Sequence, residues 1–93
     1  MTDKLRPMGA RMRILVVGAY GLLGSHVTAR LLLAGNEVIG VGRDITAAVQ
    51  RFPDVTWVRA DLRFTSAEQW AAHLKGVDAV VNCAGAPAGW AAR

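Results

Sequence analysis

The sequence predicts a three-layer α/β domain, in which helices flank a parallel sheet with the strand order 3-2-1-4. Three observations lead to this prediction. Short apolar runs alternate with segments of helical periodicity, which gives the pattern β-α-β-α-β-α-β without an internal repeat. The first run, residues 14–17, is apolar throughout, as is typical of a strand buried on both faces. Glycines at positions 18, 21 and 24 then lead directly into the first helix.

The composition is that of one globular domain. The chain has 93 residues, of which 53% are hydrophobic, and this excludes a disordered polymer. Most of the net charge of +4 arises in residues 1–13, where no aromatic side chains are interleaved for stacking on bases, so we expect no nucleic-acid partner. The sequence lacks the run of about 18 apolar residues that a membrane helix needs. A single cysteine, Cys83, excludes an internal disulfide and favours the cytoplasm.

We divide the chain into three parts. Residues 1–12 contain Pro7 and Gly9 and lack apolar periodicity, which predicts a flexible extension. Residues 13–85 carry the alternating pattern of strands and helices and form a partial domain. Residues 86–93 are rich in small residues and continue no strand, so we expect an irregular tail.

The first helix follows the glycines and leads to the second strand. Gly35-Asn36 predicts a left-handed stop, and the strand over residues 37–41 completes a βαβ unit of about thirty residues, the length that a right-handed crossover requires. We expect the helix to pack on the sheet through the apolar residues that recur at helical spacing: Leu23, Val27, Leu31 and Ala34.

The second helix is short. Asp44 is a candidate cap for a helix over residues 45–52, which Pro53 ends, and a third strand follows over residues 55–59.

The third helix begins with a capping-box pattern. Thr65 or Ser66 serves as the N-cap, and Glu68-Gln69 supplies the matching acceptor. The helix ends at about Lys75 before Gly76, and a fourth strand covers residues 78–81.

The glycines at the first strand-to-helix junction predict a phosphate-binding turn. Without side chains at Gly18, Gly21 and Gly24, the backbone N–H groups can approach a pyrophosphate, and the helix packs close to its strand. The helix N-terminus adds free donors and partial positive charge. The alternative is a tight turn that binds nothing.

The spacing Gly-x-x-Gly-x-x-Gly resembles the short-chain dehydrogenase/reductase superfamily, in particular its extended and atypical branches, which include sugar-nucleotide epimerases. The resemblance implies a Rossmann-type NAD(P)-binding domain whose loop backbone holds the pyrophosphate. Members of the superfamily usually need more than twice this length, so we interpret the chain as a truncated N-terminal portion. The remaining loop residues expected in this contact are Ala19, Tyr20, Leu22 and Leu23.

The end of the second strand predicts the choice of cofactor. An acidic residue there would bind the ribose hydroxyls of NAD and repel the 2′-phosphate of NADP. The sequence has Gly42-Arg43 instead, and a guanidinium pairs with phosphate, so NADP is favoured over NAD. Asp44, one residue further along, weakens this preference because its carboxylate would favour NAD. The alternative interpretation of Arg43 is a solvated cation in a loop.

Two further motifs resemble those of the superfamily. Asp61-Leu62 matches a pair that lies beside the adenine ring, although a turn cap explains Asp61 equally well. Asn82-Cys83-Ala84-Gly85 matches the Asn-Asn-Ala-Gly motif, whose small residues admit the nicotinamide-side ribose and whose first asparagine ties adjacent strands together. Cys83 has no partner histidine, so we expect a buried thiol rather than a nucleophile. No metal site is predicted from His26 or His73.

No catalytic residue is predicted, because the superfamily's Tyr-x-x-x-Lys element does not occur in the sequence. The favoured hypothesis is the cofactor-binding N-terminal half of a reductase or epimerase-like enzyme, without turnover in this form. An alternative is a nucleotide-binding or redox-sensing module that acts through a partner protein, docked on the open edge of the fourth strand. The same edge predicts self-association. A purely structural fragment without a ligand is the third possibility.

Overall fold

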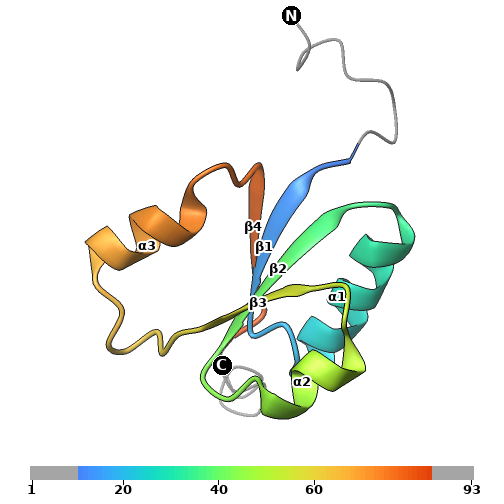
Figure 1. The fold of residues 1–93 in the computed structure, drawn as a ribbon, viewed down its shortest axis with the longest axis horizontal. Helices are drawn as coiled ribbons and strands as arrows, with labels where there is room; N and C mark the ends of the chain where they lie inside the picture. Colours follow the sequence, from blue (N-terminus) through green and yellow to red (C-terminus); the bar gives the residue numbers. More distant parts are fainter. Residues whose placement is uncertain (1–10, 85–93) are drawn as a thin grey trace, which may run out of the picture.

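The computed structural model describes residues 11–84 of the chain, so Gly85 and the predicted tail lie outside the described residues. Within them, strands and helices alternate as the sequence predicts (Figure 1). The elements are β1 (Arg13–Val17), α1 (Leu22–Leu33), β2 (Glu37–Gly42), α2 (Thr46–Arg51), β3 (Thr56–Arg59), α3 (Ala67–Leu74) and β4 (Ala79–Asn82).

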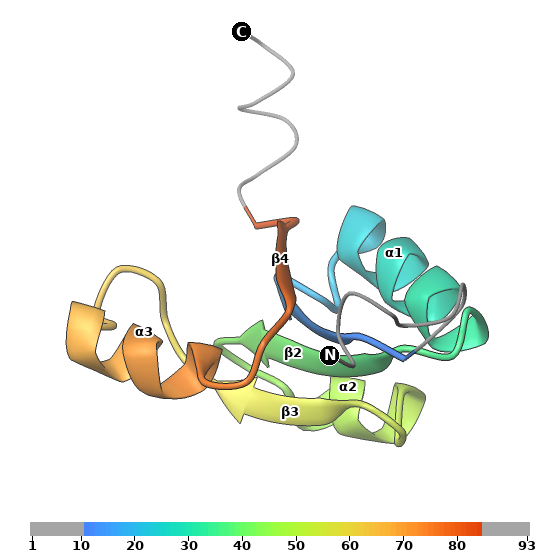
Figure 2. The same cartoon turned by 90° about the horizontal axis from the view of Figure 1, so that it is seen from above.

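The four strands form one parallel sheet in the order β3-β2-β1-β4, which confirms the predicted topology. β1 lies inside the sheet, with Leu15 paired to Ile39 of β2 and to Val80 of β4. Figure 2 shows α1 and α2 on one face of the sheet and α3 on the other, which confirms the three layers. All four strands end at the same edge, because parallel strands share a direction.

The core consists of two apolar clusters, one on each face of the sheet. Successive residues of β1 point to opposite faces, so Val16 packs with Val38 on one face and Leu15 with Ile39 on the other. Leu15 and Val16 are fully buried, and each such side chain contributes about 2 kcal/mol of hydrophobic stabilisation. The predicted strand buried on both faces is therefore confirmed.

The packing face of α1 differs in part from the prediction. Leu31 packs against the core as predicted and Val27 is partly buried, but Leu23 is 59% exposed and Ala34 is exposed. The buried residues of the helix are Gly24, Ser25 and Thr28. The reason is close contact between α1 and the turn before it: the Thr28 hydroxyl donates a hydrogen bond to the Ala19 carbonyl (3.2 Å). This contact presents the small residues of the helix to the sheet.

Several predicted stops and caps are confirmed. Gly35 and Gly76 follow α1 and α3 with φ of +89° and +77°, the left-handed backbone that glycine adopts without strain. At the start of α3, Gln69 N–H donates to the Ser66 hydroxyl (3.2 Å), and Ser66 N–H donates to the Gln69 side chain (2.8 Å). The capping box therefore uses Ser66 rather than Thr65.

α2 is shorter than the predicted helix over residues 45–52. Its N-cap position is Ile45, which makes no side-chain cap, while the Asp44 carboxylate accepts the Thr46 N–H (3.1 Å). Met12, placed in the extension by sequence, packs against the core, and its carbonyl accepts the Glu37 N–H (2.8 Å). None of the helices in residues 11–84 combines the length and the apolar character that crossing a bilayer demands.

Candidate functional site

The turn between β1 and α1 is shaped by contacts of Gly18. Its φ is +74°, and a Cβ there would lie 2.9 Å from the Ala84 nitrogen, so a side chain is excluded by both backbone conformation and space. The Gly18 N–H donates to the Val41 carbonyl (2.9 Å), which fixes the turn to the end of β2.

Gly24 and Gly21 are glycines for different reasons. A Cβ on Gly24 would lie 1.9 Å from the Gly18 carbonyl oxygen, so Gly24 permits the close contact between α1 and the turn. A Cβ on Gly21 would find only that same oxygen, at 3.6 Å, and the φ of −70° suits any residue. The packing of residues 11–84 therefore does not require glycine at position 21, and Gly21 borders an open space, the pocket described below.

The N-terminus of α1 faces this space. Gly21 is the N-cap and offers no side-chain cap, and the first turn contains no acidic residue. The first N–H groups of a helix lack partners inside the helix and carry partial positive charge, so this end of α1 is suited to an anion.

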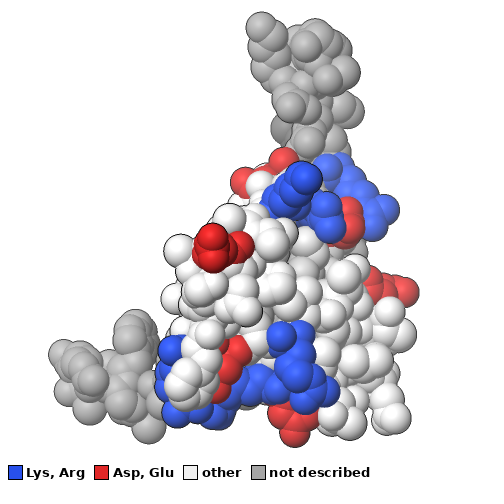
Figure 3. Space-filling view, turned by 60° about the vertical axis from the view of Figure 1, so that its left-hand side comes forward, with Lys and Arg blue, Asp and Glu red and all other residues white. Residues whose placement is uncertain are grey.

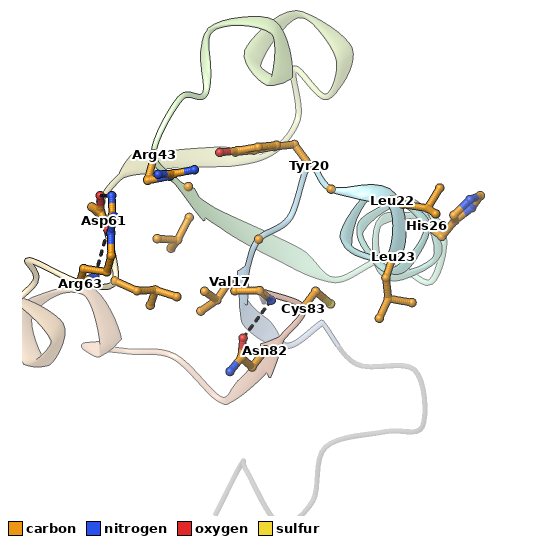
Figure 4. A pocket seen from close by; sticks show the side chains of 17 residues that line it. Val17, Tyr20, Leu22, Leu23, His26, Arg43, Asp61, Arg63, Asn82 and Cys83 are labelled. Carbon is orange, nitrogen blue, oxygen red and sulfur yellow. Dashed lines mark hydrogen bonds and ion pairs between the residues drawn. The ribbon is translucent and has the colours of Figure 1, made fainter. Parts of the chain in front are cut away.

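A pocket of about 1000 Å³ lies along the carboxyl ends of the strands. In Figure 4 it extends from Leu22, Leu23 and His26 on α1, past Val17 and Cys83, to Arg43 and Asp61. The structure brings most predicted site residues to its walls: Gly18, Tyr20, Gly21, Leu22, Leu23, Gly42, Arg43, Asp61, Leu62, Asn82, Cys83 and Ala84.

The remaining predicted residues do not line the pocket. Ala19 lies in the turn with its side chain fully buried, and Gly24 on α1 is buried against the turn. Both therefore support the shape of the turn without lining the pocket. Gly85 lies outside the described residues. The prediction missed five lining residues. Val17, Val41 and Ala60 lie at the ends of strands, and the predicted topology could have indicated them. No sequence pattern indicated His26 or Arg63.

At the β2 end of the pocket the Arg43 guanidinium belongs to the lining, whereas the Asp44 carboxylate does not. Arg43 is exposed and lines the pocket. Asp44 does not line it, because its carboxylate is directed at the start of α2, where hydrogen bonds from Thr46 lower the pKa of Asp44. Ala60 N–H donates to the Gly42 carbonyl (2.9 Å) and joins the ends of β2 and β3.

Asp61 is engaged by Arg63 at the rim of the pocket. The Arg63 Nε and Nη2 atoms donate to the two carboxylate oxygens (3.2 and 3.0 Å), and the Arg63 backbone N–H also donates to Oδ1 (2.9 Å). These hydrogen bonds, with the Arg63 charge, lower the pKa of Asp61. The carboxylate thus acts as a turn cap, which favours that interpretation of Asp61 over an acceptor reserved for adenine.

The β4 end contains small residues and a cysteine, Cys83, which is partly rather than fully buried. The Asn82 side chain accepts the Ala84 N–H (3.0 Å) within its own turn, so the prediction that it ties adjacent strands together is wrong for the described residues. Asn82 is the last residue of β4, which among the described strands pairs with β1 alone. Burial raises the pKa of the Cys83 thiol, which disfavours the thiolate that a nucleophile needs. Residues 11–84 contain no cluster suited to a metal ion.

Taken together, a 3-2-1-4 parallel sheet with a glycine turn and a pocket at its carboxyl edge defines a Rossmann-like nucleotide-binding domain. The model of the NAD dependent epimerase/dehydratase family matches residues 14–93. The chain belongs to this family.

Similar proteins are considerably longer. An uncharacterised protein of Mycobacterium tuberculosis is 41% identical over 73 residues, which are 78% of this chain and 8% of that protein. The UDP-N-acetylglucosamine 4-epimerase of Bacillus cereus superposes with a TM-score of 0.65 at 29% identity, over 82% of this chain and 25% of that one. The dTDP-glucose 4,6-dehydratase of Bacillus anthracis in complex with NAD has a TM-score of 0.65 at 21% identity, over 85% and 28%. The chain therefore spans less than a third of each of these proteins.

Proposed function

We propose that the chain binds a nicotinamide dinucleotide in this pocket, as the cofactor-binding part of an epimerase/dehydratase-type oxidoreductase. The observation that carries the proposal is Gly21, which lines the pocket and whose missing side chain leaves room that the packing of the described residues does not demand. Family membership supports the cofactor class, and the dehydratase of Bacillus anthracis was crystallised with NAD.

The pocket offers separate groups for each part of the cofactor. The backbone of residues 18–23 and the N-terminus of α1 would hold the pyrophosphate. The small residues after β4, with Val17 at the end of β1, would receive the nicotinamide-side ribose. When bound, the nicotinamide would supply hydride acceptance or donation, and Cys83, whose thiol pKa is raised by burial, lines the same part of the pocket.

NADP is the favoured cofactor in this proposal. Arg43 and Arg63 both line the adenosine end of the pocket, and a guanidinium pairs with a phosphate through two hydrogen bonds. Asp44, the carboxylate that would oppose a 2′-phosphate, is occupied by the Thr46 N–H. Asp61 is already compensated by Arg63.

We further propose that the chain alone binds the cofactor without turnover, because the sequence has no Tyr-x-x-x-Lys. The single cysteine supports a cytoplasmic location.

Calorimetric titration of the chain with NADPH and NADH tests the proposal. The wild type is expected to bind, and Gly21→Val is expected to abolish binding of both nucleotides while the circular dichroism spectrum stays that of the wild type, because the valine fills the cleft without touching the core. Ala47→Val is the matched control: it adds a larger side chain at an exposed position of α2 away from the pocket. Retained affinity in Gly21→Val would show that the turn is not the site.

The alternative, a binding module that acts through a partner or a second copy, is supported by the sheet edge. Among the described strands, β4 is paired on one side only, and Val80 on it is 51% exposed. Such an edge favours addition of another strand. Sedimentation over a range of concentrations tests this: a monomer throughout would count against self-association.

The proposal keeps the expectation of a small-molecule ligand rather than a nucleic acid, and the charge on one face of the molecule supports it. On the face shown in Figure 3, lysines and arginines gather in two separate groups with mostly uncharged surface between them. Nucleic-acid binding favours a continuous basic stripe.

A further inference from the structure

Tyr20 connects the glycine turn to the end of β2. Its ring lies directly against Gly42: a Cβ on that glycine would stand 2.1 Å from the ring atom Cε2 and 2.8 Å from Cζ. Only a glycine at position 42 leaves room for the ring. The tyrosine lies in the phosphate-binding turn, so one side chain bridges the two ends of the pocket.

The Tyr20 hydroxyl also holds the chain just after β2. It accepts a hydrogen bond from the Asp44 N–H (3.3 Å). The Asp44 carboxylate in turn accepts the Thr46 N–H (3.1 Å) and therefore points to α2 instead of the pocket. Arg43, between Gly42 and Asp44, is left lining the pocket at the end where Figure 4 draws Tyr20.

These contacts bear on which charge would face a ligand at this end of the pocket. If the turn over residues 42–44 were released, the Asp44 carboxylate could reach the adenosine end of the pocket. There it would accept hydrogen bonds from two ribose hydroxyls and repel a 2′-phosphate. With the turn held, the phosphate meets the Arg43 guanidinium instead.

We propose that Tyr20 is a positioning residue for cofactor choice: it holds the turn over residues 42–44 so that Arg43, and not Asp44, faces the adenosine end of the cofactor. This inference rests on the proposed function, because it assigns that end of the dinucleotide to the β2 side of the pocket. It adds a residue of the glycine turn to the determinants of the choice, which otherwise lie after β2 and β3.

The test compares ADP-ribose with 2′-phospho-ADP-ribose, because both probes lack nicotinamide and report on the adenosine end alone. Tyr20→Phe keeps the ring on Gly42 and removes the acceptor for the Asp44 N–H. We expect the preference for the 2′-phosphorylated probe to fall about fivefold, the value of one hydrogen bond. A wild-type preference in Tyr20→Phe overturns the inference.

Trp57→Phe is the matched control. The Trp57 ring is 6.4 Å from that of Tyr20, but it packs on Gly40 and does not line the pocket. Its indole N–H donates to the Phe52 carbonyl (3.1 Å), so the variant lowers stability and is expected to leave the preference unchanged. An equal loss of preference in Trp57→Phe would show that Tyr20 acts through general stability and would also overturn the inference.

A second readout separates this inference from the proposed function. Hydrogen exchange followed by nuclear magnetic resonance reports the Asp44 amide without any ligand. In Tyr20→Phe the Asp44 amide is expected to exchange about fivefold faster, while the Gly18 amide, bonded to Val41, stays unchanged. Unchanged Asp44 exchange overturns the positioning by Tyr20. If the wild type binds neither probe but the Asp44 amide exchanges faster in Tyr20→Phe, the proposed function is overturned. The result would still show that Tyr20 holds the turn over residues 42–44.

Discussion

At the α1 end of the pocket a glycine turn and the uncharged start of a helix set the shape, whereas at the β2–β3 end charged side chains line the wall. Gly18, Gly21 and Gly24 shape the first end by what they lack. Arg43 and the Asp61–Arg63 ion pair shape the second by the charges they carry. Under the proposed function, the part of the site that would take the pyrophosphate is therefore set by steric fit, and the part that would select the cofactor depends on exposed charges.

The largest expected effect is at the backbone-built end. Gly24→Ala places a Cβ 1.9 Å from the Gly18 carbonyl oxygen, and neither backbone segment can move without breaking the contact of α1 with the sheet. We expect a loss of about 3 kcal/mol in the free energy of unfolding, measured by urea denaturation. Gly21→Ala is the control, with a change below about 1 kcal/mol, because its Cβ has free space. Equal stabilities of the two variants would remove the distinction between the glycines.

An intermediate effect is expected at the charged end. Arg43→Asp removes the cation that would pair with a 2′-phosphate and introduces a repelling charge, so the ratio of NADPH to NADH affinity is expected to fall at least about tenfold. Calorimetric titration measures the ratio. Arg51→Asp, the same charge change on α2 outside the pocket, is the control and should leave it near the wild-type value. An unchanged ratio in Arg43→Asp would remove NADP as the favoured cofactor.

The smallest expected effect is the pH dependence of the Asp61–Arg63 pair. Hydrogen bonds from Arg63 lower the folded-state pKa of Asp61 below its ordinary value of 3.8, so the stability that the pair contributes is present above that value and is lost as the pH falls through the folded-state pKa. Asp61→Asn should flatten this part of the acid unfolding curve slightly, because the pair is exposed. A variant curve parallel to that of the wild type below pH 3.8 would show that the pair contributes nothing.

The sequence predicted the sheet order and the glycine turn because both follow from local rules. The run Ile14–Val17 is short, apolar throughout and followed by glycine, which is typical of a strand buried on both faces, and the glycines spaced after it identify the turn. The capping box at Ser66 was predictable for the same reason, since its partners are three residues apart.

What the sequence could not predict depends on contacts between segments. The spacing of Leu23 and Ala34 indicates a helix, but the rotation of α1 is set by how closely Gly24 and Thr28 meet the preceding turn. The pairing of Arg63 with Asp61 depends on the conformation of an irregular segment, for which periodicity gives no signal. The contact of Tyr20 with Gly42 joins residues far apart in the sequence, which no local pattern records.

The hydrogen bond from Gly18 to Val41 has a thermodynamic consequence. Since the loop is already anchored to a central strand, its backbone is ordered before a ligand binds. Little of the binding free energy would therefore be lost to ordering the loop. Any nucleotide held there would in turn resist separation of β1 from β2. Binding should therefore raise the melting temperature of the whole sheet in proportion to the logarithm of the ligand concentration. The effect would not be limited to lower mobility of one loop.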